Sequence, residues 1–90
     1  MNKIELLAQE SAPLLNNGRE TGLTFVSMYG DGNWVVTVHV KRETAVQYAD
    51  DADAATPVMK ETGRDLDAVL DLMLDRVRAA VAGITAEAVA

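Results

Sequence analysis

Two runs of alternating apolar and polar residues flank a glycine-rich turn in the first half of the chain. Residues 23–29 and 34–40 are rich in β-branched and aromatic side chains, and Gly30-Asp31-Gly32-Asn33 lies between them. Asp-Gly suits the positive φ angles of a tight turn, so the pattern predicts an antiparallel β-hairpin.

The register of this hairpin depends on the length of the turn. We expect a two-residue loop at Asp31-Gly32, which places Phe25 opposite Val38; a loop at Gly32-Asn33 would shift the partners but preserve the two faces. A three-residue loop would break the pattern, because a slip of one residue sends side chains to opposite sides of a sheet. The face predicted to enter the core carries Leu23, Phe25, Tyr29, Trp34, Val36, Val38 and Val40.

A helical repeat runs through the last third of the chain. Apolar residues recur there at intervals of three and four, which is typical of an amphipathic helix. Asp65 is the expected N-cap and Gly83 the expected C-cap. Residues 84–90 are expected to form either a loose tail or a short helical extension. The apolar face of this helix comprises Leu66, Val69, Leu70, Met73, Leu74, Val77 and Val81.

The remaining segments are less regular. A helix is predicted over about residues 2–12, followed by a kink or a fresh turn at Pro13, because proline donates no backbone hydrogen bond. Asn16-Asn17-Gly18 is the expected end of this region. Residues 44–48 are expected to form either a third strand or a short helix. Residues 49–56 are expected to form an acidic mobile loop, and residues 57–62 are expected to form a short edge strand.

These elements predict one small α+β domain over residues 1–90, in the order α-β-β-(β)-α, with the hairpin sheet packed against the C-terminal helix. The double-stranded-RNA-binding fold shares this element order. Its last helix begins with a basic stretch, which is replaced here by Gly63-Arg64-Asp65-Leu66-Asp67. We therefore infer nothing about RNA from the shared order. The residues expected to pack together are Phe25, Trp34, Val36 and Val38 with Leu66, Leu70, Met73 and Val77.

Negative charge is concentrated in one part of the chain. The formal net charge is −6, and residues 43–75 hold nine acidic and two basic residues, a net charge of −7. Because a phosphate backbone is bound by clustered Lys and Arg, we expect no direct binding to nucleic acid. No apolar run approaches the roughly 20 residues of a membrane span, and no signal-peptide pattern is present. We expect a cytoplasmic protein that does not bind membranes.

The main candidate site is acidic. Asp67, Asp71 and Asp75 recur every four residues and therefore share one side of the predicted helix. Together with the loop aspartates Asp50, Asp51 and Asp53, they form a predicted anionic strip that resembles a row of phosphates. The hypothesis is an inhibitor, of the kind that phages and mobile elements carry, that occupies a basic nucleic-acid-binding site of a partner protein. The alternative role of the strip is solubility alone.

A second candidate site is a narrow apolar stripe on the same helix. Ala68, Leu72 and Ala79 lie almost opposite the main apolar face, and small residues allow another helix to approach closely. Together with a half-apolar second sheet face, the stripe predicts a homodimer. The alternative function is therefore a homo-oligomeric structural or regulatory protein.

Sites for catalysis, metals and cofactors are not predicted. The chain has no cysteine and one histidine, His39. The run of aspartates at residues 50–53 lacks the spacing of an EF-hand loop. A strand, not a helix, follows Gly30-Asp31-Gly32, so this segment is a turn and not a phosphate-binding loop. We expect no enzyme activity, no cofactor and no metal ion.

Overall fold

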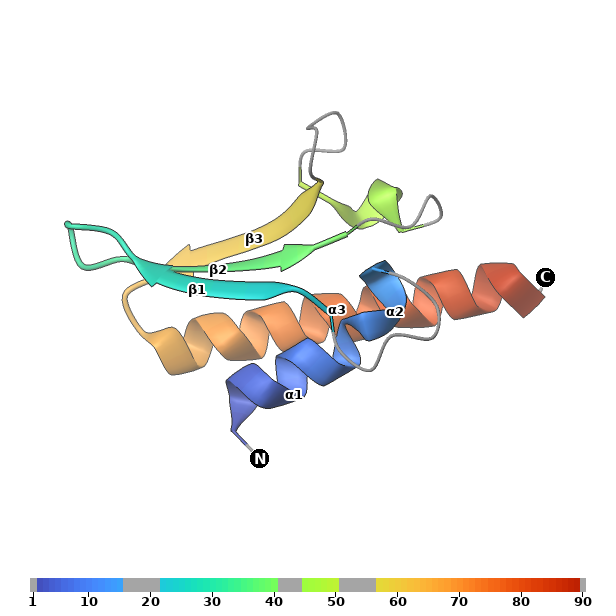
Figure 1. The fold of residues 1–90 in the computed structure, drawn as a ribbon, viewed down its shortest axis with the longest axis horizontal. Coiled ribbons are helices and arrows are strands. Elements are labelled where there is room, and N and C mark those ends of the chain that lie inside the picture. Colours follow the sequence, from blue (N-terminus) through green and yellow to red (C-terminus); the bar gives the residue numbers. More distant parts are fainter. Residues whose placement is uncertain (1, 16–21, 41–44, 51–56, 90) are drawn as a thin grey trace.

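The computed structural model describes residues 2–15, 22–40, 45–50 and 57–89. A three-stranded antiparallel sheet in the order β1-β2-β3 is covered on one side by helices (Figure 1). This arrangement confirms the α+β class and the strand expected near residues 57–62. The elements are α1 (Lys3–Glu10), α2 (Ala12–Leu15), β1 (Thr24–Met28), β2 (Trp34–His39), the 3₁₀ helix η1 (Val46–Tyr48), β3 (Val58–Gly63) and α3 (Leu66–Val89).

The N-terminal region is divided into two helices, as Pro13 predicts. Asn2 caps α1, because its side-chain oxygen accepts a hydrogen bond from the Glu5 amide at 2.8 Å. The chain turns at Ser11, which is buried, and Pro13 lies within the short α2. The expected stop at Asn16-Asn17-Gly18 falls outside the described residues.

The hairpin turn is one residue longer than predicted. Gly30, Asp31 and Gly32 form the loop, the Tyr29 amide donates to the Asn33 carbonyl at 2.8 Å, and Gly32 has a φ of 90°. A three-residue turn that ends on a glycine with positive φ produces a glycine bulge. The Asp31 carboxylate stabilises this turn by accepting from the Asn33 amide at 3.0 Å.

The longer turn moves β1 by one residue relative to β2. Met28 pairs with Trp34 and Phe25 with Thr37, so the expected pairing of Phe25 with Val38 is wrong. The β2 half of the predicted core face is confirmed, because Val36 and Val38 are buried against the helices. The β1 half is wrong. Leu23, Phe25 and Tyr29 lie on the side of the sheet away from the helices and are exposed.

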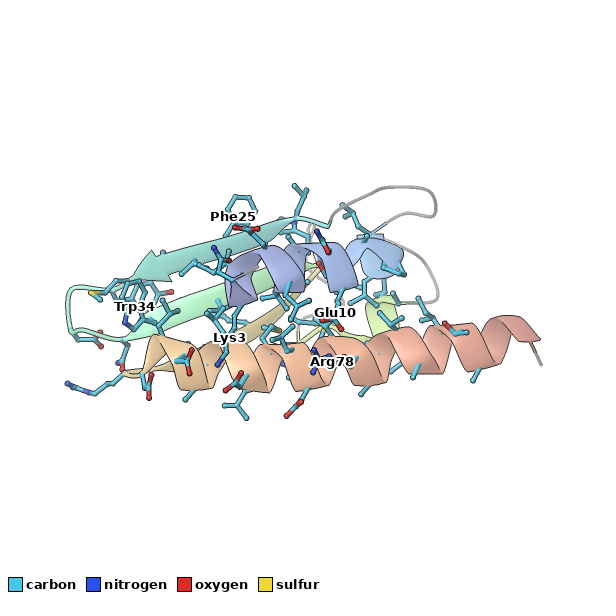
Figure 2. The ribbon with its side chains drawn as sticks, turned by 90° about the horizontal axis from the view of Figure 1, so that it is seen from below. Lys3, Glu10, Phe25, Trp34 and Arg78 are labelled. Atoms are coloured by element: carbon cyan, nitrogen blue, oxygen red, sulfur yellow. The ribbon has the colours of Figure 1, made fainter. Side chains whose placement is uncertain are left out.

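The inner side of the sheet packs on two helices. α3 contacts β2 and β3, and α1 contacts α3 and β1, so the helices form one layer below the sheet (Figures 1 and 2). Trp34, at the start of β2, is half-buried. The buried core includes Leu7, Leu14, Val36, Val38, Met59, Val69, Leu70, Met73, Leu74 and Val77.

The last helix begins as predicted and continues beyond its predicted end. Asp65 caps it, because its carboxylate accepts from the Asp67 amide at 3.1 Å. The helix runs through Gly83 to Val89, so the expected C-cap at Gly83 is wrong and the helical extension is the alternative observed. Gly83 leaves room for Tyr48 of η1, whose hydroxyl lies where a β-carbon would stand. A glycine at this position therefore reflects close packing.

The structure decides between the strand and the short helix expected at residues 44–48. It has a short helix there, the 3₁₀ helix η1. Within the expected acidic loop at 49–56, Asp50 is described and is attached to β3. Among the described residues, no helix is both long and apolar enough to cross a membrane.

The turn geometry predicts different tolerance at two neighbouring glycines. Gly32→Ala should lower the free energy of unfolding by about 1 kcal/mol, because a β-carbon is unfavourable at positive φ. Gly30→Ala is the matched control, because its φ is not in that range and a β-carbon there would contact nothing within 4 Å. Urea unfolding of both variants measures the difference. Equal losses would contradict the glycine-bulge turn.

Candidate functional site

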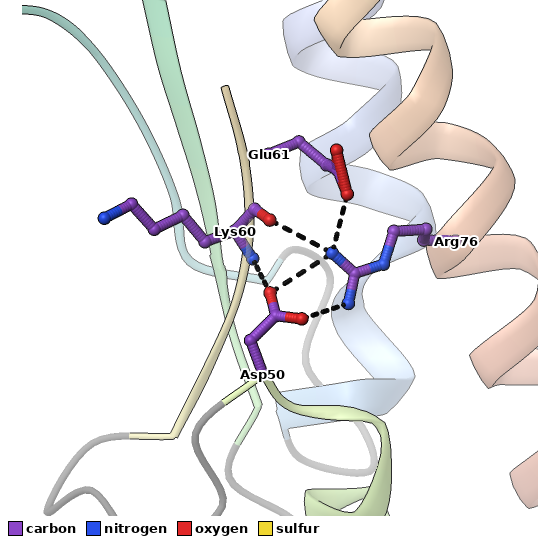
Figure 3. Close-up of polar contacts among 4 residues, drawn as sticks. All are labelled: Asp50, Lys60, Glu61 and Arg76. Carbon is purple, nitrogen blue, oxygen red and sulfur yellow. Dashed lines mark hydrogen bonds and ion pairs between the residues drawn. The ribbon is translucent and has the colours of Figure 1, made fainter. Parts of the chain in front are cut away.

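The predicted acidic strip is divided between two sides of the molecule. Asp50 lies at the outer edge of β3, where its carboxylate accepts from the Lys60 amide at 2.6 Å (Figure 3). Arg76 of α3 binds both oxygens of the same carboxylate, at 2.9 and 3.2 Å. Asp50 is therefore part of the connection between β3 and α3.

Arg76 completes this cluster with two further acceptors. Its guanidinium donates to the Glu61 carboxylate at 3.0 Å and to the Lys60 carbonyl at 3.1 Å. Hydrogen bonds from Arg76 hold the pKa of Asp50 below its usual value, and Asp50 in turn raises the pKa of Arg76. Burial opposes both shifts, so the charge-assisted hydrogen bonds are the dominant effect.

The aspartates of α3 lie on the other side of that helix, near α1. Lys3 places its amine 2.8 Å from Asp67 and 2.9 Å from Asp71. Figure 2 shows Lys3 reaching from α1 to α3. Hydrogen bonds to Asp67 first, and then to Asp71, raise the pKa of Lys3. One lysine thus compensates part of the charge of two aspartates.

A second ion pair joins α1 to α3 farther along both helices. Arg78 donates to both oxygens of Glu10, at 2.8 and 3.0 Å (Figure 2). This bidentate pair lowers the pKa of Glu10 and raises that of Arg78. It also forms one wall of a surface hollow of about 270 Å³, which Val81 and Ala82 line as well. Because Glu10 and Arg78 are paired with each other, neither offers an unpaired charge to a ligand in this hollow.

The two predicted surfaces of α3 coincide in the structure. Asp75 follows Leu72 by three residues and precedes Ala79 by four, so it lies between them on one face of the helix. Ala68, Leu72, Asp75 and Ala79 are all exposed, Leu72 to 52%. Asp71 is exposed beside them, whereas Asp51 and Asp53 lie outside the described residues. The exposed side of α3 therefore combines aspartates with one large apolar side chain.

An uncovered apolar surface lies on the opposite side of the molecule. The outer face of the sheet exposes Phe25, whose ring packs at a tilt of 57° against that of His39, with the ring centroids 5.1 Å apart. Leu23 and Tyr29 flank Phe25 on the same side and are about half-exposed. This surface was not predicted, because the alternating pattern places these residues in the core; the signal that points to it is the alternative of a three-residue turn.

Within the described part of the chain, no three histidine, aspartate or glutamate side chains are grouped so that they could hold a metal ion. Comparisons of the chain with protein-family models, with curated proteins and with solved structures found no match.

The contacts of Asp50 with Arg76 and Lys60 predict that Asp50 stabilises the fold, although the sequence placed it in the predicted anionic strip. Asp50→Asn should lower the free energy of unfolding by about 1–2 kcal/mol, because it weakens charge-assisted bonds in a partly exposed site. Asp75→Asn, which removes the same charge from the exposed side of α3, should change it by no more than about 0.5 kcal/mol. Chemical denaturation of the two variants tests this. Equal effects would exclude a structural role for Asp50.

The same ion pairs predict how stability changes with pH. Because the pKa values of Asp50 and Glu10 are lowered by folding, their contribution is fully present above their unfolded pKa values, about 3.8 and 4.5. It is lost as the pH falls through the lower folded values. The stability of the double variant Asp50→Asn/Glu10→Gln should therefore fall less than that of the wild type between pH 5 and pH 2. Thermal unfolding over this range measures the difference, and parallel curves would contradict it.

Proposed function

We propose that this chain is a small non-enzymatic protein-interaction domain that inhibits a nucleic-acid-binding protein by occupying its basic site. The binding surface is the exposed side of α3. The observation that supports this proposal is that Asp71 and Asp75 are exposed on this side together with Leu72, and that Asp67 is exposed one helical turn before Asp71.

The chemistry of this surface fits a basic partner. Specific interfaces commonly have an apolar centre surrounded by polar groups. Leu72 supplies such a centre, and Asp71 and Asp75 flank it on a rigid helix. Fixed negative charges attract a surface rich in Lys and Arg and accelerate its association at low salt. A partner arginine would compete with Lys3 for Asp67 and Asp71.

The surface is smaller than the predicted strip. Asp50 is bound to Arg76 and contributes to the connection between β3 and α3, so the proposal does not depend on it. The proposal rests on the aspartates of α3 and extends to Asp51 and Asp53 only as a sequence-based expectation. A cytoplasmic location, where such a partner would be met, is part of the same proposal.

The alternative is a homo-oligomeric structural or regulatory protein. A dimer through Ala68, Leu72 and Ala79 would bring the aspartates of two copies of α3 together, and like charges at close range repel. The exposed side of α3 therefore fits a basic partner better than it fits a second copy.

The binding surface can be tested by charge removal. Affinity capture from the native host, followed by mass spectrometry, should yield a nucleic-acid-binding protein, and the purified chain should displace nucleic acid from it. Asp71→Asn/Asp75→Asn should weaken this binding by about tenfold or more, because it removes two exposed charges from the interface. The binding should also weaken as salt is added.

The matched control is Glu5→Gln/Asp31→Asn, which causes the same change in net charge at exposed positions away from this surface. Its affinity should stay within about twofold of the wild type, because distant exposed charges are screened. If both double variants weakened the binding equally, the affinity would depend on net charge alone and not on the exposed side of α3. Unchanged affinity in Asp71→Asn/Asp75→Asn would exclude the α3 surface.

A further inference from the structure

We propose that two copies of this chain associate through the free edge of β1, which joins their sheets into one continuous antiparallel sheet. Val26 of each copy lies beside Val26 of the other at the two-fold axis. This surface is separate from the exposed side of α3, so the proposal goes beyond the function proposed above and does not depend on it.

The two edges of the sheet differ in how their backbone groups are used. At the β3 edge, the Asp50 carboxylate accepts from the Lys60 amide, Arg76 donates to the Lys60 carbonyl, and the Asp50 amide donates to the Val58 carbonyl. These contacts block the addition of another strand along much of β3 (Figure 3). The β3 edge is therefore closed by Asp50 and Arg76.

The β1 edge has no comparable cover among the described residues. His39 donates to the Leu23 carbonyl and Tyr29 to the Asn33 carbonyl, so the odd-numbered residues of this strand bond to β2. Because the direction of the backbone groups alternates along a strand, those of Thr24, Val26 and Met28 point outward. No hydrogen bond from the described part of the chain reaches these outward groups. In Figure 2, β1 forms the outer margin of the sheet, beyond α1.

The composition of β1 lacks the usual protection of an exposed edge. Natural edge strands commonly carry lysine, proline or a bulge that prevents pairing with another chain. Residues 22–29 contain no charged residue and no proline, and the glycine bulge lies beyond them in the turn. Strand addition at this edge is therefore not opposed by the sequence.

The outward groups of β1 are complementary to themselves. An antiparallel pairing centred on Val26 places Thr24 of one copy opposite Met28 of the other. Each of these three residues then lies in a hydrogen-bonded pair, with its amide and its carbonyl both used. Such a pairing is symmetric by construction, which is what a closed dimer requires.

The same register covers apolar side chains that the monomer leaves exposed. On the outer face, Leu23 of one copy lies opposite Tyr29 of the other, and Phe25 lies opposite Ser27. Phe25 is 55% exposed in the monomer and Tyr29 51%. Aromatic side chains bury about 150–250 Å² each when fully covered, so the half-exposed Phe25 and Tyr29 of two copies contribute roughly 300–500 Å² to an interface of the small, weakly associating kind. We expect a dissociation constant in the micromolar range.

Charge favours a second copy over another partner at this edge. Each chain carries a net charge of −6, so two copies can approach closely only where neither presents carboxylates. The segment 22–29 meets that condition, whereas the exposed side of α3 does not. An uncharged strand also offers a charged peptide no complementary group.

Two glutamate substitutions on opposite edges test the interface. Ser27 and Thr62 both pair with Val35 of β2, are both exposed, and project from the same face of the sheet. Sedimentation equilibrium from about 1 to 500 µM should show a monomer–dimer equilibrium for the wild type. Ser27→Glu should weaken the dimer at least tenfold, because two like charges are brought close together at the two-fold axis. Thr62→Glu should leave it within about twofold.

Three results of this measurement would overturn the proposal. They are a wild type that stays monomeric over the whole range, equal effects of the two glutamates, and a dimer that dissociates with Leu72→Asp but not with Ser27→Glu. Circular dichroism shows whether each variant is folded. If Ser27→Glu does not fold, disulfide cross-linking through Val26→Cys decides.

A cysteine substitution tests the register, because the chain contains no cysteine of its own. Residues in a hydrogen-bonded antiparallel pair have their α-carbons about 5.5 Å apart, within the range of a disulfide. Val26→Cys should therefore form a covalent dimer under mild oxidation, and Thr62→Cys should not. Cross-linking through Thr62→Cys alone, or through neither variant, would exclude the pairing centred on Val26.

Discussion

The hairpin turn decides on which side of the sheet each β1 side chain lies. Gly32 adopts a φ of 90° and closes a turn of three residues, which fixes β1 one residue away from the register of a two-residue turn. Val26 consequently faces the helices, and Phe25 faces away from them. The packing of Val26 on the core, the exposed outer face of the sheet and the apolar character of the β1 edge all depend on this turn.

The basic residues of this acidic chain hold its elements together. Arg76 links α3 to β3 through Asp50 and Glu61, and Lys3 and Arg78 link α3 to α1. Each of these contacts removes a carboxylate, wholly or in part, from the charge available to a partner. The negative surface that remains on α3 is therefore smaller and better defined than the acidic composition of residues 43–75 indicates.

The two proposed surfaces lie on different layers of the domain. The exposed side of α3 belongs to the helical layer and the β1 edge to the sheet, so a dimer through β1 leaves both copies of α3 uncovered (Figures 1 and 2). A dimer of this kind would display two acidic surfaces, and two linked sites bind a repetitive or dimeric partner more tightly than one. The proposals are independent, but their geometry is compatible.

The sequence by itself determined the features that depend on local chemistry. The apolar repeat and the Asp65 cap of α3, the division of the N-terminal helix near Pro13 and the strand after Pro57 follow from spacing, capping and proline geometry. The periodic faces of α3 and β2 were predictable because each depends on one element alone. Only the tertiary structure decided the hairpin register, since Asp31-Gly32 suits turns of two lengths and the difference reverses the faces of β1. It also decided the role of Asp50, because the acceptor of a distant arginine depends on how β3 and α3 pack.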